Sequence, residues 1–171
     1  MPKILMVIAP VHFRDEELFV PKGFFESKKL KVDVASLVKT PVNGMLGKSI
    51  RPDLLISEVV LDEYSAVVFV GGIGVEDRKL YENKEYVSLA KLAFMRGMVV
   101  AEICVAPKIL ASAGILKNRK ATVFSTGIEY LKSKGAVVLN QDVVQDGMVI
   151  TASGPNAARK FAEKIYDMLS F

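Results

Sequence analysis

The sequence contains one cysteine and one histidine in 171 residues, and these two scarcities exclude whole classes of site. A single cysteine cannot form a disulfide within the chain, so the reducing cytoplasm is the expected compartment. One histidine and one cysteine are too few for a zinc site built from several such ligands in one chain, so no metal is expected. No apolar run approaches the roughly 18–20 residues that a spanning helix needs, so no membrane contact is expected either.

The chain also has little excess charge. Its 23 basic and 19 acidic residues give a net charge of +4, and the densest basic cluster is Lys28, Lys29 and Lys31. Nucleic-acid-binding proteins concentrate positive charge on one face, so this dispersed charge indicates a solvated surface and no nucleic-acid partner. Hydrophobic residues make up 51% of the chain, which excludes intrinsic disorder, and the length fits one domain over residues 1–171.

Apolar runs alternate along the chain with segments of helical spacing, and this order predicts the fold class. The alternation is typical of an α/β, flavodoxin-like three-layer sandwich, in which a mostly parallel central sheet has helices on both faces. Pro21 predicts a kink or break in the first helix, and Asn43-Gly44 predicts a hairpin turn. The predicted strands are 3–9, 31–36, 66–70, 98–103, 121–124, 137–139, 142–144 and 148–151; short strands and turns fill 37–55; the predicted helices are 15–27, 82–96, 106–113, 127–134 and 155–169.

Ligands bind such sheets at the carboxyl ends of the strands, where three predicted loops carry reactive or flexible residues. These are residues 12–17, the Gly71-Gly72 pair and Cys104. Cys104 lies at a junction between a strand and a helix, as the nucleophile does in a nucleophile elbow. A helix N-terminus there favours the thiolate and lowers the thiol pKa. The alternative is an inert, buried cysteine.

The other two loops supply a carboxyl group and free backbone N–H groups. Glu17 is either favourable charge at a helix start, beside Asp15 and Glu16, or a buried protonated acid that donates a hydrogen bond to the Cys104 sulfur. The Gly71-Gly72 pair is either a plain turn or half of an oxyanion hole, completed by the N–H that follows Cys104. Its spacing matches neither a dinucleotide-binding nor a phosphate-binding loop, so no cofactor is expected.

His12, the single histidine, lies in the first of these loops. A histidine there is either a general base for the site or a residue of the surface or the packing.

Taken together, these residues resemble the PfpI family of intracellular cysteine peptidase-like proteins. That family belongs to the class I glutamine amidotransferase-like superfamily and includes the parkinsonism-associated deglycase. The resemblance covers nearly the whole chain and implies a single PfpI-like domain over residues 1–171. The matching stretches are Phe13-Arg14-Asp15-Glu16-Glu17-Leu18 with Pro21, 67–72, 101–107 continuing through 109–122, and the tail at 146–147 and 151–155.

The resemblance implies roles for individual residues. Cys104 corresponds to the family nucleophile, and Glu17 to the acid that hydrogen-bonds its sulfur. The N–H groups of Gly72 and Val105 correspond to the oxyanion hole. The family also implies a homodimer or hexamer. Residues expected to line the site are His12, Gly71, Ala106, Phe124 and Ser125.

The chain departs from the family pattern where a base would be. Peptidase-type members have histidine directly after the cysteine, where this chain has Val105. Deglycase-type members can supply a histidine from the segment 123–125, and none is present. Ala106 replaces a usual glycine, and Ser153 replaces an arginine of the deglycase branch. Cysteine peptidases need a base within hydrogen-bond reach, so these departures disfavour peptidase activity.

Four functions remain open. The favoured one is an enzyme that acts on small reactive carbonyls through Cys104 and Glu17, in the manner of a glyoxalase or deglycase. The second is a redox sensor or protective protein with an oxidisable Cys104. The third is an intracellular peptidase or amidase with His12, or a residue of a second subunit, as base. The fourth is a family member whose cysteine is only structural.

Overall fold

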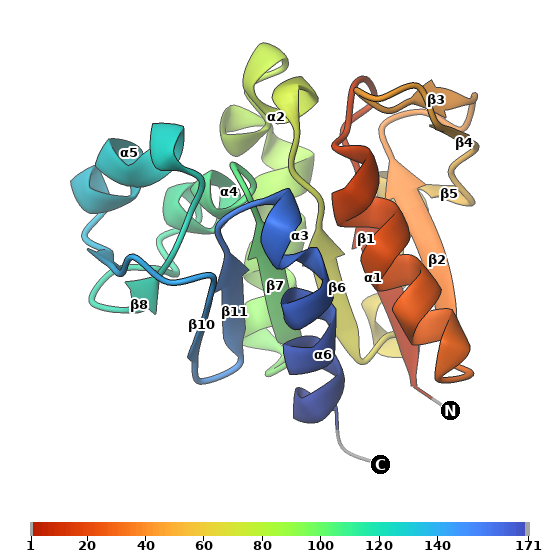
Figure 1. Cartoon of the computed structure of the whole chain (residues 1–171). Helices are drawn as coiled ribbons and strands as arrows, with labels where there is room; N and C mark the ends of the chain where they lie inside the picture. The colour runs from red at the N-terminus through yellow and green to blue at the C-terminus, as the bar shows by residue number, and fades with distance from the viewer. Residues whose placement is uncertain (1, 170–171) are drawn as a thin grey trace.

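A computed structural model describes residues 2–169 and builds them around one seven-stranded sheet (Figure 1). In chain order the strands of this sheet are β1 (Lys3–Val7), β2 (Lys31–Ser36), β5 (Leu54–Leu55), β6 (Ala66–Phe69), β7 (Val99–Ile103), β10 (Val143–Asp146) and β11 (Val149–Ala152). In space their order is β10-β11-β7-β6-β1-β2-β5, and every neighbouring pair is parallel except β10 and β11. The carboxyl ends of β1, β6 and β7 therefore lie side by side at one edge.

Helices cover both faces of the sheet (Figure 1). Helix α1 packs against α6 on one face, and α3 packs against α4 on the other. The helices are α1 (Asp15–Ser27), α2 (Ile73–Asp77), α3 (Lys84–Met95), α4 (Pro107–Ser112), α5 (Ile128–Ser133) and α6 (Ala158–Met168). The predicted three-layer α/β architecture is therefore confirmed. Within residues 2–169 no helix is both long and apolar enough to cross a membrane.

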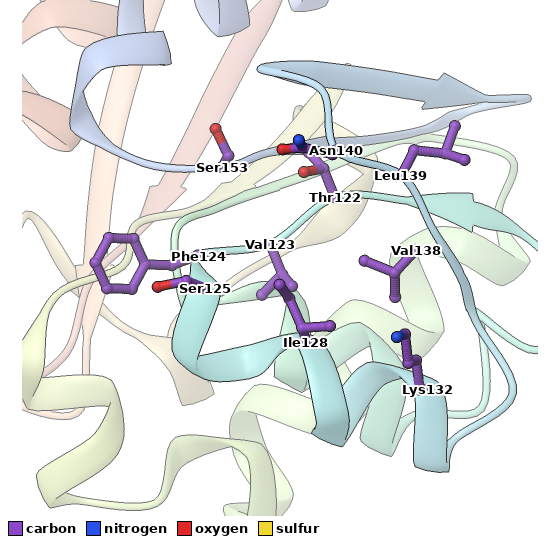
Figure 2. A pocket seen from close by; sticks show the side chains of 10 residues that line it. All are labelled: Thr122, Val123, Phe124, Ser125, Ile128, Lys132, Val138, Leu139, Asn140 and Ser153. Atoms are coloured by element: carbon purple, nitrogen blue, oxygen red, sulfur yellow. The ribbon is translucent and has the colours of Figure 1, made fainter.

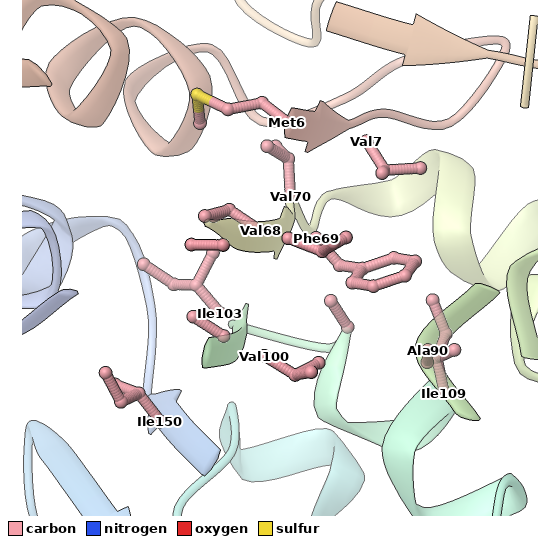
Figure 3. Packing of buried hydrophobic residues seen from close by; sticks show 14 of the residues in the cluster. Met6, Val7, Val68, Phe69, Val70, Ala90, Val100, Ile103, Ile109 and Ile150 are labelled. Carbon is pink, nitrogen blue, oxygen red and sulfur yellow. The ribbon is translucent and has the colours of Figure 1, made fainter. Parts of the chain in front are cut away.

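The core lies between the middle strands and the two helical layers. Strands β1, β6 and β7 are buried along nearly their whole length, because both faces of a parallel sheet are covered (Figure 3). Burial of apolar side chains stabilises the fold by about 25 cal/mol per Å². A polar contact adds to this packing, since the buried Tyr86 hydroxyl of α3 donates a hydrogen bond to the Ile8 carbonyl at 2.7 Å.

Several local predictions differ from the structure. Helix α1 continues through Pro21 without a break, because this proline lies on the buried face, where packing offsets the lost hydrogen bond. The hairpin predicted at Asn43-Gly44 is present, because β3 (Val42–Asn43) pairs antiparallel with β4 (Ser49–Ile50), but its loop is longer than a two-residue turn, and the Gly44 N–H bonds the Lys48 carbonyl at 2.7 Å. The strand predicted at 121–124 is only β8 (Lys120–Ala121), paired with β9 (Val137–Val138).

Candidate functional site

Three loops that are distant in sequence meet at the carboxyl edge of the central strands. Glu17 comes from α1, after β1; Gly71 and Gly72 follow β6; and Cys104 follows β7. These strands are adjacent in the order β7-β6-β1, so the sheet brings the three groups together. The grouping predicted from the sequence is the grouping in the structure.

Cys104 occupies a tight turn between β7 and α4. Its φ is +64°, in the left-handed region that residues other than glycine rarely adopt. Hydrogen bonds hold the turn on both sides: the Cys104 N–H donates to the Ala152 carbonyl at 2.9 Å, and the Cys104 carbonyl accepts from the Phe124 N–H at 2.8 Å. The Ala106 N–H closes the turn on the Ile103 carbonyl at 3.1 Å. This strand–turn–helix geometry is that of a nucleophile elbow.

Glu17 is completely buried behind the sulfur. Its Oε1 accepts a hydrogen bond from the Gly71 N–H at 3.0 Å, and its carboxyl group also hydrogen-bonds the Cys104 thiol. Among the described residues, Oε2 has no partner of ordinary hydrogen-bond geometry, so the contact with sulfur is the looser of the two. The carboxyl group is held at one oxygen and remains available to the sulfur at the other.

Gly71 lies between Glu17 and Cys104, where there is no space for a side chain. A Cβ at position 71 would lie 2.7 Å from the Cys104 Cβ, 2.7 Å from Glu17 Oε1 and 2.7 Å from the Ile103 carbonyl oxygen. No real Cβ tolerates three such contacts. Only glycine therefore allows the acid and the cysteine to approach each other across this backbone.

The acid and the thiol influence each other's titration. Burial raises the pKa of Glu17 to about 8, so this carboxyl group holds its proton at neutral pH. Burial also raises the pKa of the Cys104 thiol, and a negative charge on Glu17 raises it further. While Glu17 is protonated, it carries no negative charge that could raise the pKa of Cys104, and the O–H of its carboxyl group is able to donate to the sulfur. The two groups titrate as a coupled pair.

Backbone N–H groups act in the opposite direction. Hydrogen bonds from the N–H groups of Val105 and Gly72 to the sulfur lower the pKa of Cys104. They do not outweigh burial, so the expectation that the helix N-terminus lowers the thiol pKa overall is not met. Helix α4 begins only at Pro107, beyond the turn. The same two N–H groups lie next to the sulfur. If the sulfur adds to a carbonyl carbon, the carbonyl oxygen gains negative charge close to these donors.

Cys104 opens into a cavity of about 330 Å³. Two charged residues, Arg14 and Glu76, lie in its wall, and most of the remaining wall is apolar. The cysteine is only 7% exposed, so a reactant reaches the sulfur through this cavity. The residues that line it are Arg14, Met45, Gly72, Ile73, Glu76, Cys104, Val105, Phe124, Thr126 and Pro155.

The two charged residues of the wall have different partners. The Arg14 guanidinium lies on the Glu16 carboxylate, with Nε at 2.7 Å and Nη2 at 3.2 Å. Glu76 accepts from Nζ of the buried Lys108 at 3.0 and 3.1 Å. The Lys108 ammonium also lies 3.8 Å from the centre of the Tyr81 ring. Glu76 is therefore neutralised from inside the protein, whereas the partner of Arg14 is partly exposed.

Several residues expected in the site lie elsewhere. His12 is exposed and outside the wall of the Cys104 cavity; it has a φ of +44°, and its backbone bonds Asn43 and Gly74. Ala106 is buried beneath the turn and lines no part of that wall. Phe124 does line the cavity.

Ser125 faces a second cavity, of about 440 Å³, which shares Phe124 with the first (Figure 2). Figure 2 shows this second cavity between the chain at 122–128 and the segment 138–140, with Ser153 at one end. Ser125 therefore lies next to the cysteine site rather than in it.

The sequence pointed only partly to the residues of the cavity wall. Arg14 lies inside the matching stretch 13–18, where a run of four charged residues does not show which side chain faces a cavity. Glu76 follows the glycine pair in α2, a helix of five residues that no periodicity predicted. Met45 comes from the β3–β4 loop, where no motif marks a binding residue.

A second buried acid lies close to the site. Glu102 of β7 is completely buried, and burial raises its pKa well above the ordinary value. Both of its carboxyl oxygens lack a hydrogen-bond partner of ordinary geometry among residues 2–169. The Leu110 N–H of α4 acts on this carboxyl group and lowers its pKa, but less than burial raises it. In the same range no cluster of His, Cys, Asp or Glu side chains is arranged to hold a metal ion.

Comparisons with known proteins find relatives over nearly the whole chain. The family model described as the DJ-1/PfpI family matches residues 2–168. An uncharacterized protein of Methanocaldococcus jannaschii is 48% identical over 95% of this chain and 80% of its own length. The deglycase PfpI of Pyrococcus furiosus is 35% identical over 90% of each chain. The crystal structure of a ThiJ/PfpI domain protein from Brachyspira murdochii has a TM-score of 0.93 and 36% identity, with 98% of each chain covered.

Proposed function

The chain belongs to the DJ-1/PfpI family, and from this premise we propose that it is a cytoplasmic enzyme that converts small reactive carbonyl compounds through Cys104 and Glu17. The observation that carries the proposal is the pairing of a buried, protonated Glu17 with the sulfur at the floor of a cavity. Relatives named as deglycases, at about one third identity, support the same chemistry.

The proposed reaction begins with the addition of the thiol to an aldehyde. The sulfur forms a bond to the aldehyde carbon, and the C=O π electrons move to the oxygen. Glu17 donates its proton to that oxygen and takes up the thiol proton, so the product is a neutral hemithioacetal. The N–H groups of Gly72 and Val105 stabilise the developing oxyanion.

With a 2-oxoaldehyde the reaction continues without any external oxidant. Glu17 removes the proton from the hemithioacetal carbon, the C–H bonding electrons form a C=C bond, and the adjacent carbonyl oxygen gains a proton, which gives an enediol. A proton then returns to the second carbon while the hydroxyl group on the first carbon loses its proton, so the first carbon is oxidised to a thioester and the second is reduced to an alcohol. Water then cleaves the thioester, which releases a 2-hydroxycarboxylate and restores the thiol. No histidine takes part, which suits a cavity whose described wall contains no histidine.

The test is the consumption of methylglyoxal and glyoxal by the wild-type protein, Cys104→Ala and His12→Ala. We expect no consumption above the uncatalysed rate with Cys104→Ala, because no other cysteine is present. His12→Ala is the matched control and keeps wild-type activity, since His12 lies outside the wall of the cavity. Wild-type activity in Cys104→Ala would overturn the proposal.

Oxidation of Cys104 is the second proposed function. Two features favour it: the Glu17 Oε2, which has no partner of ordinary geometry among residues 2–169, and the two N–H groups at the sulfur. An oxidised sulfur carries oxygens that a protonated carboxyl group and N–H groups bind. Mass spectrometry after mild peroxide treatment tests it. An unmodified Cys104 beside oxidised methionines would contradict it.

Peptidase or amidase activity has no support in the cavity wall. The described residues of that wall include no histidine, so peptide hydrolysis would need a base from a second subunit. A panel of peptide and amide substrates with the wild-type protein is the direct check.

We also propose a homodimer or hexamer, as the family implies. Exposed apolar side chains at Val20 and Leu46, which border one shallow hollow, support an interface there. Light scattering on the purified protein measures the oligomeric state.

A further inference from the structure

Arg14 gives the Cys104 cavity a cation at its wall. The described wall contains one basic residue, Arg14, and one acidic residue, Glu76. Apolar side chains such as Met45 and Ile73 make up much of the rest. Coulombic attraction inside a partly enclosed, apolar cavity is stronger than in open water. Arg14 is therefore the one described wall residue whose charge attracts an anionic ligand.

The position of Arg14 is fixed at both ends. Its backbone N–H donates to the Gly71 carbonyl at 3.0 Å, which ties it to the loop that also binds Glu17. Its guanidinium rests on Glu16 through Nε and Nη2. Arginine has five N–H donors, so three of them have no protein partner within residues 2–169. The guanidinium also interacts electrostatically with Glu17 and Cys104, which places its charge within range of the reacting groups.

The acid in the cavity wall does not cancel this charge. Both Glu76 oxygens lie within 3.1 Å of the Lys108 ammonium, which is itself buried against the Tyr81 ring. The Glu76–Lys108 pair is thus neutral as a unit. The partner of Arg14, Glu16, lies partly in solvent, where its attraction is screened.

We propose that Arg14 makes the Cys104 cavity selective for aldehydes that carry a carboxylate, with the guanidinium binding the carboxylate while the sulfur adds to the aldehyde carbon. This inference rests on the proposed function and names its substrate class. A guanidinium matches a carboxylate through paired N–H donors, which a neutral carbonyl compound cannot use equally well. The addition step is the one described above, in which the carboxylate is unchanged.

The test measures hemithioacetal formation directly rather than turnover. Aldehydes that occupy Cys104 slow its alkylation by iodoacetamide, and mass spectrometry follows the rate against aldehyde concentration. The probes are two acids, glyoxylate and 4-oxobutanoate, and their methyl esters, which retain the aldehyde and lose the charge. We expect at least one acid to protect at about tenfold lower concentration than its ester, the size of one charge-assisted hydrogen bond.

Variants locate the preference on Arg14. Arg14→Gln abolishes the difference between acid and ester, and Arg14→Lys keeps part of it, since a lysine retains the charge without the planar fork. Glu16→Gln enlarges the difference because it removes the competing carboxylate. Arg51→Gln is the matched control, because Arg51 is an exposed arginine outside the cavity wall, and it leaves the difference unchanged.

The outcomes separate this inference from the function on which it rests. Equal protection by each acid and its ester overturns the role of Arg14 and leaves the carbonyl chemistry standing. A preference that survives in Arg14→Gln overturns the role of Arg14 as well. No protection by any aldehyde, with a thiol that still reacts with iodoacetamide, overturns both proposals.

Discussion

Glu17 and Glu102 are both completely buried acids close to the Cys104 turn, and they have opposite surroundings. Glu17 accepts from the Gly71 N–H and hydrogen-bonds the sulfur that faces the cavity. Glu102 belongs to β7, and neither of its carboxyl oxygens has a partner of ordinary geometry among the described residues. Burial raises the pKa of both carboxyl groups, that of Glu17 to about 8, and so favours the neutral form of each acid.

The difference shows that a raised pKa alone does not identify a functional acid. Perturbed titration marks burial, whether or not a reactive group is adjacent. Glu17 is buried and contacts the nucleophile Cys104, which in turn lines a cavity. Glu102 has the burial without the contact, so we interpret it as a cost to stability rather than as part of the chemistry.

The sharpest test exchanges each acid for its amide. Glu17→Gln removes the proton that the reaction needs, and we expect carbonyl consumption to fall about 100-fold, the lower end of what acid–base catalysis contributes. Glu102→Gln removes a proton that the reaction does not use, and we expect activity within about twofold of wild type. Steady-state consumption of methylglyoxal by the two variants, with circular dichroism to show that both fold, checks this.

Equal losses in the two variants would erase the distinction between the acids. Unchanged activity in Glu17→Gln would remove the proton shuttle from the proposed function.

Gly71→Ala disturbs the surroundings of Glu17 and leaves those of Glu102 in place. Its Cβ meets three atoms at 2.7 Å, so we expect destabilisation at the upper end of about 1–3 kcal/mol, together with a changed rate of Cys104 alkylation. Gly23→Ala is the control, because nothing lies within 4 Å of its Cβ and the helical position gains about 0.5–1 kcal/mol. Urea denaturation measures both, and a neutral Gly71→Ala would contradict the crowding.

Glu102→Met tests whether the partnerless acid costs stability. Methionine has a similar length and no oxygen to leave unsatisfied, so we expect a gain of about 2 kcal/mol at pH 5. This corresponds to a rise in Tm of roughly 2–4 °C per kcal/mol for a chain of this size. Scanning calorimetry at pH 5 checks it, and a loss of stability would mean that Glu102 has a partner in solution.

The two acids also contribute to the pH dependence of stability, and this effect is smaller than those of the substitutions above. Both are protonated in the folded protein at pH values where an unfolded glutamate, with a pKa of 4.5, is ionised. The folded state therefore binds more protons, and stability falls as pH rises above about 4.5; for Glu17 the fall ends near its folded pKa of about 8. Each acid contributes up to about 1.4 kcal/mol per pH unit.

We expect Glu102→Gln to reduce that slope between pH 5.5 and 7.5 by about one such contribution. The Glu17 contribution remains in this variant. Urea midpoints at three pH values, with m-values checked for constancy, give the slopes. An unchanged slope would show that Glu102 is ionised, or exposed, in the folded protein.

The sequence was sufficient for the frame of the site. Helix α1 begins and ends where its spacing predicts, and the turn at Cys104 follows from a buried strand running directly into a helix. Parallel neighbours align their carboxyl ends, so the meeting of Glu17, Gly71 and Cys104 follows once the sheet order is known. These features depend on local pattern and on one rule of topology.

The wall of the cavity was beyond such reasoning. Met45 and Glu76 reach it from a loop and a five-residue helix whose placement depends on tertiary contacts. The surroundings of Glu102 could not be predicted either. Strand periodicity indicates that a residue is buried, but it does not indicate whether a hydrogen-bond donor lies next to the side chain. The exposure of His12 depends on a left-handed backbone, which its sequence does not mark.

The three loops of the site follow β7, β6 and β1, which are the middle strands in the order β10-β11-β7-β6-β1-β2-β5. Local unfolding that starts at either edge of the sheet must pass β11 or β2 before it reaches these three middle strands. We therefore expect the amide hydrogens of β7, β6 and β1 to exchange with solvent only through global unfolding. A thiol reagent too bulky for a cavity of about 330 Å³ must wait for the same event. The rate at which such a reagent labels this single cysteine therefore measures the rate of global unfolding.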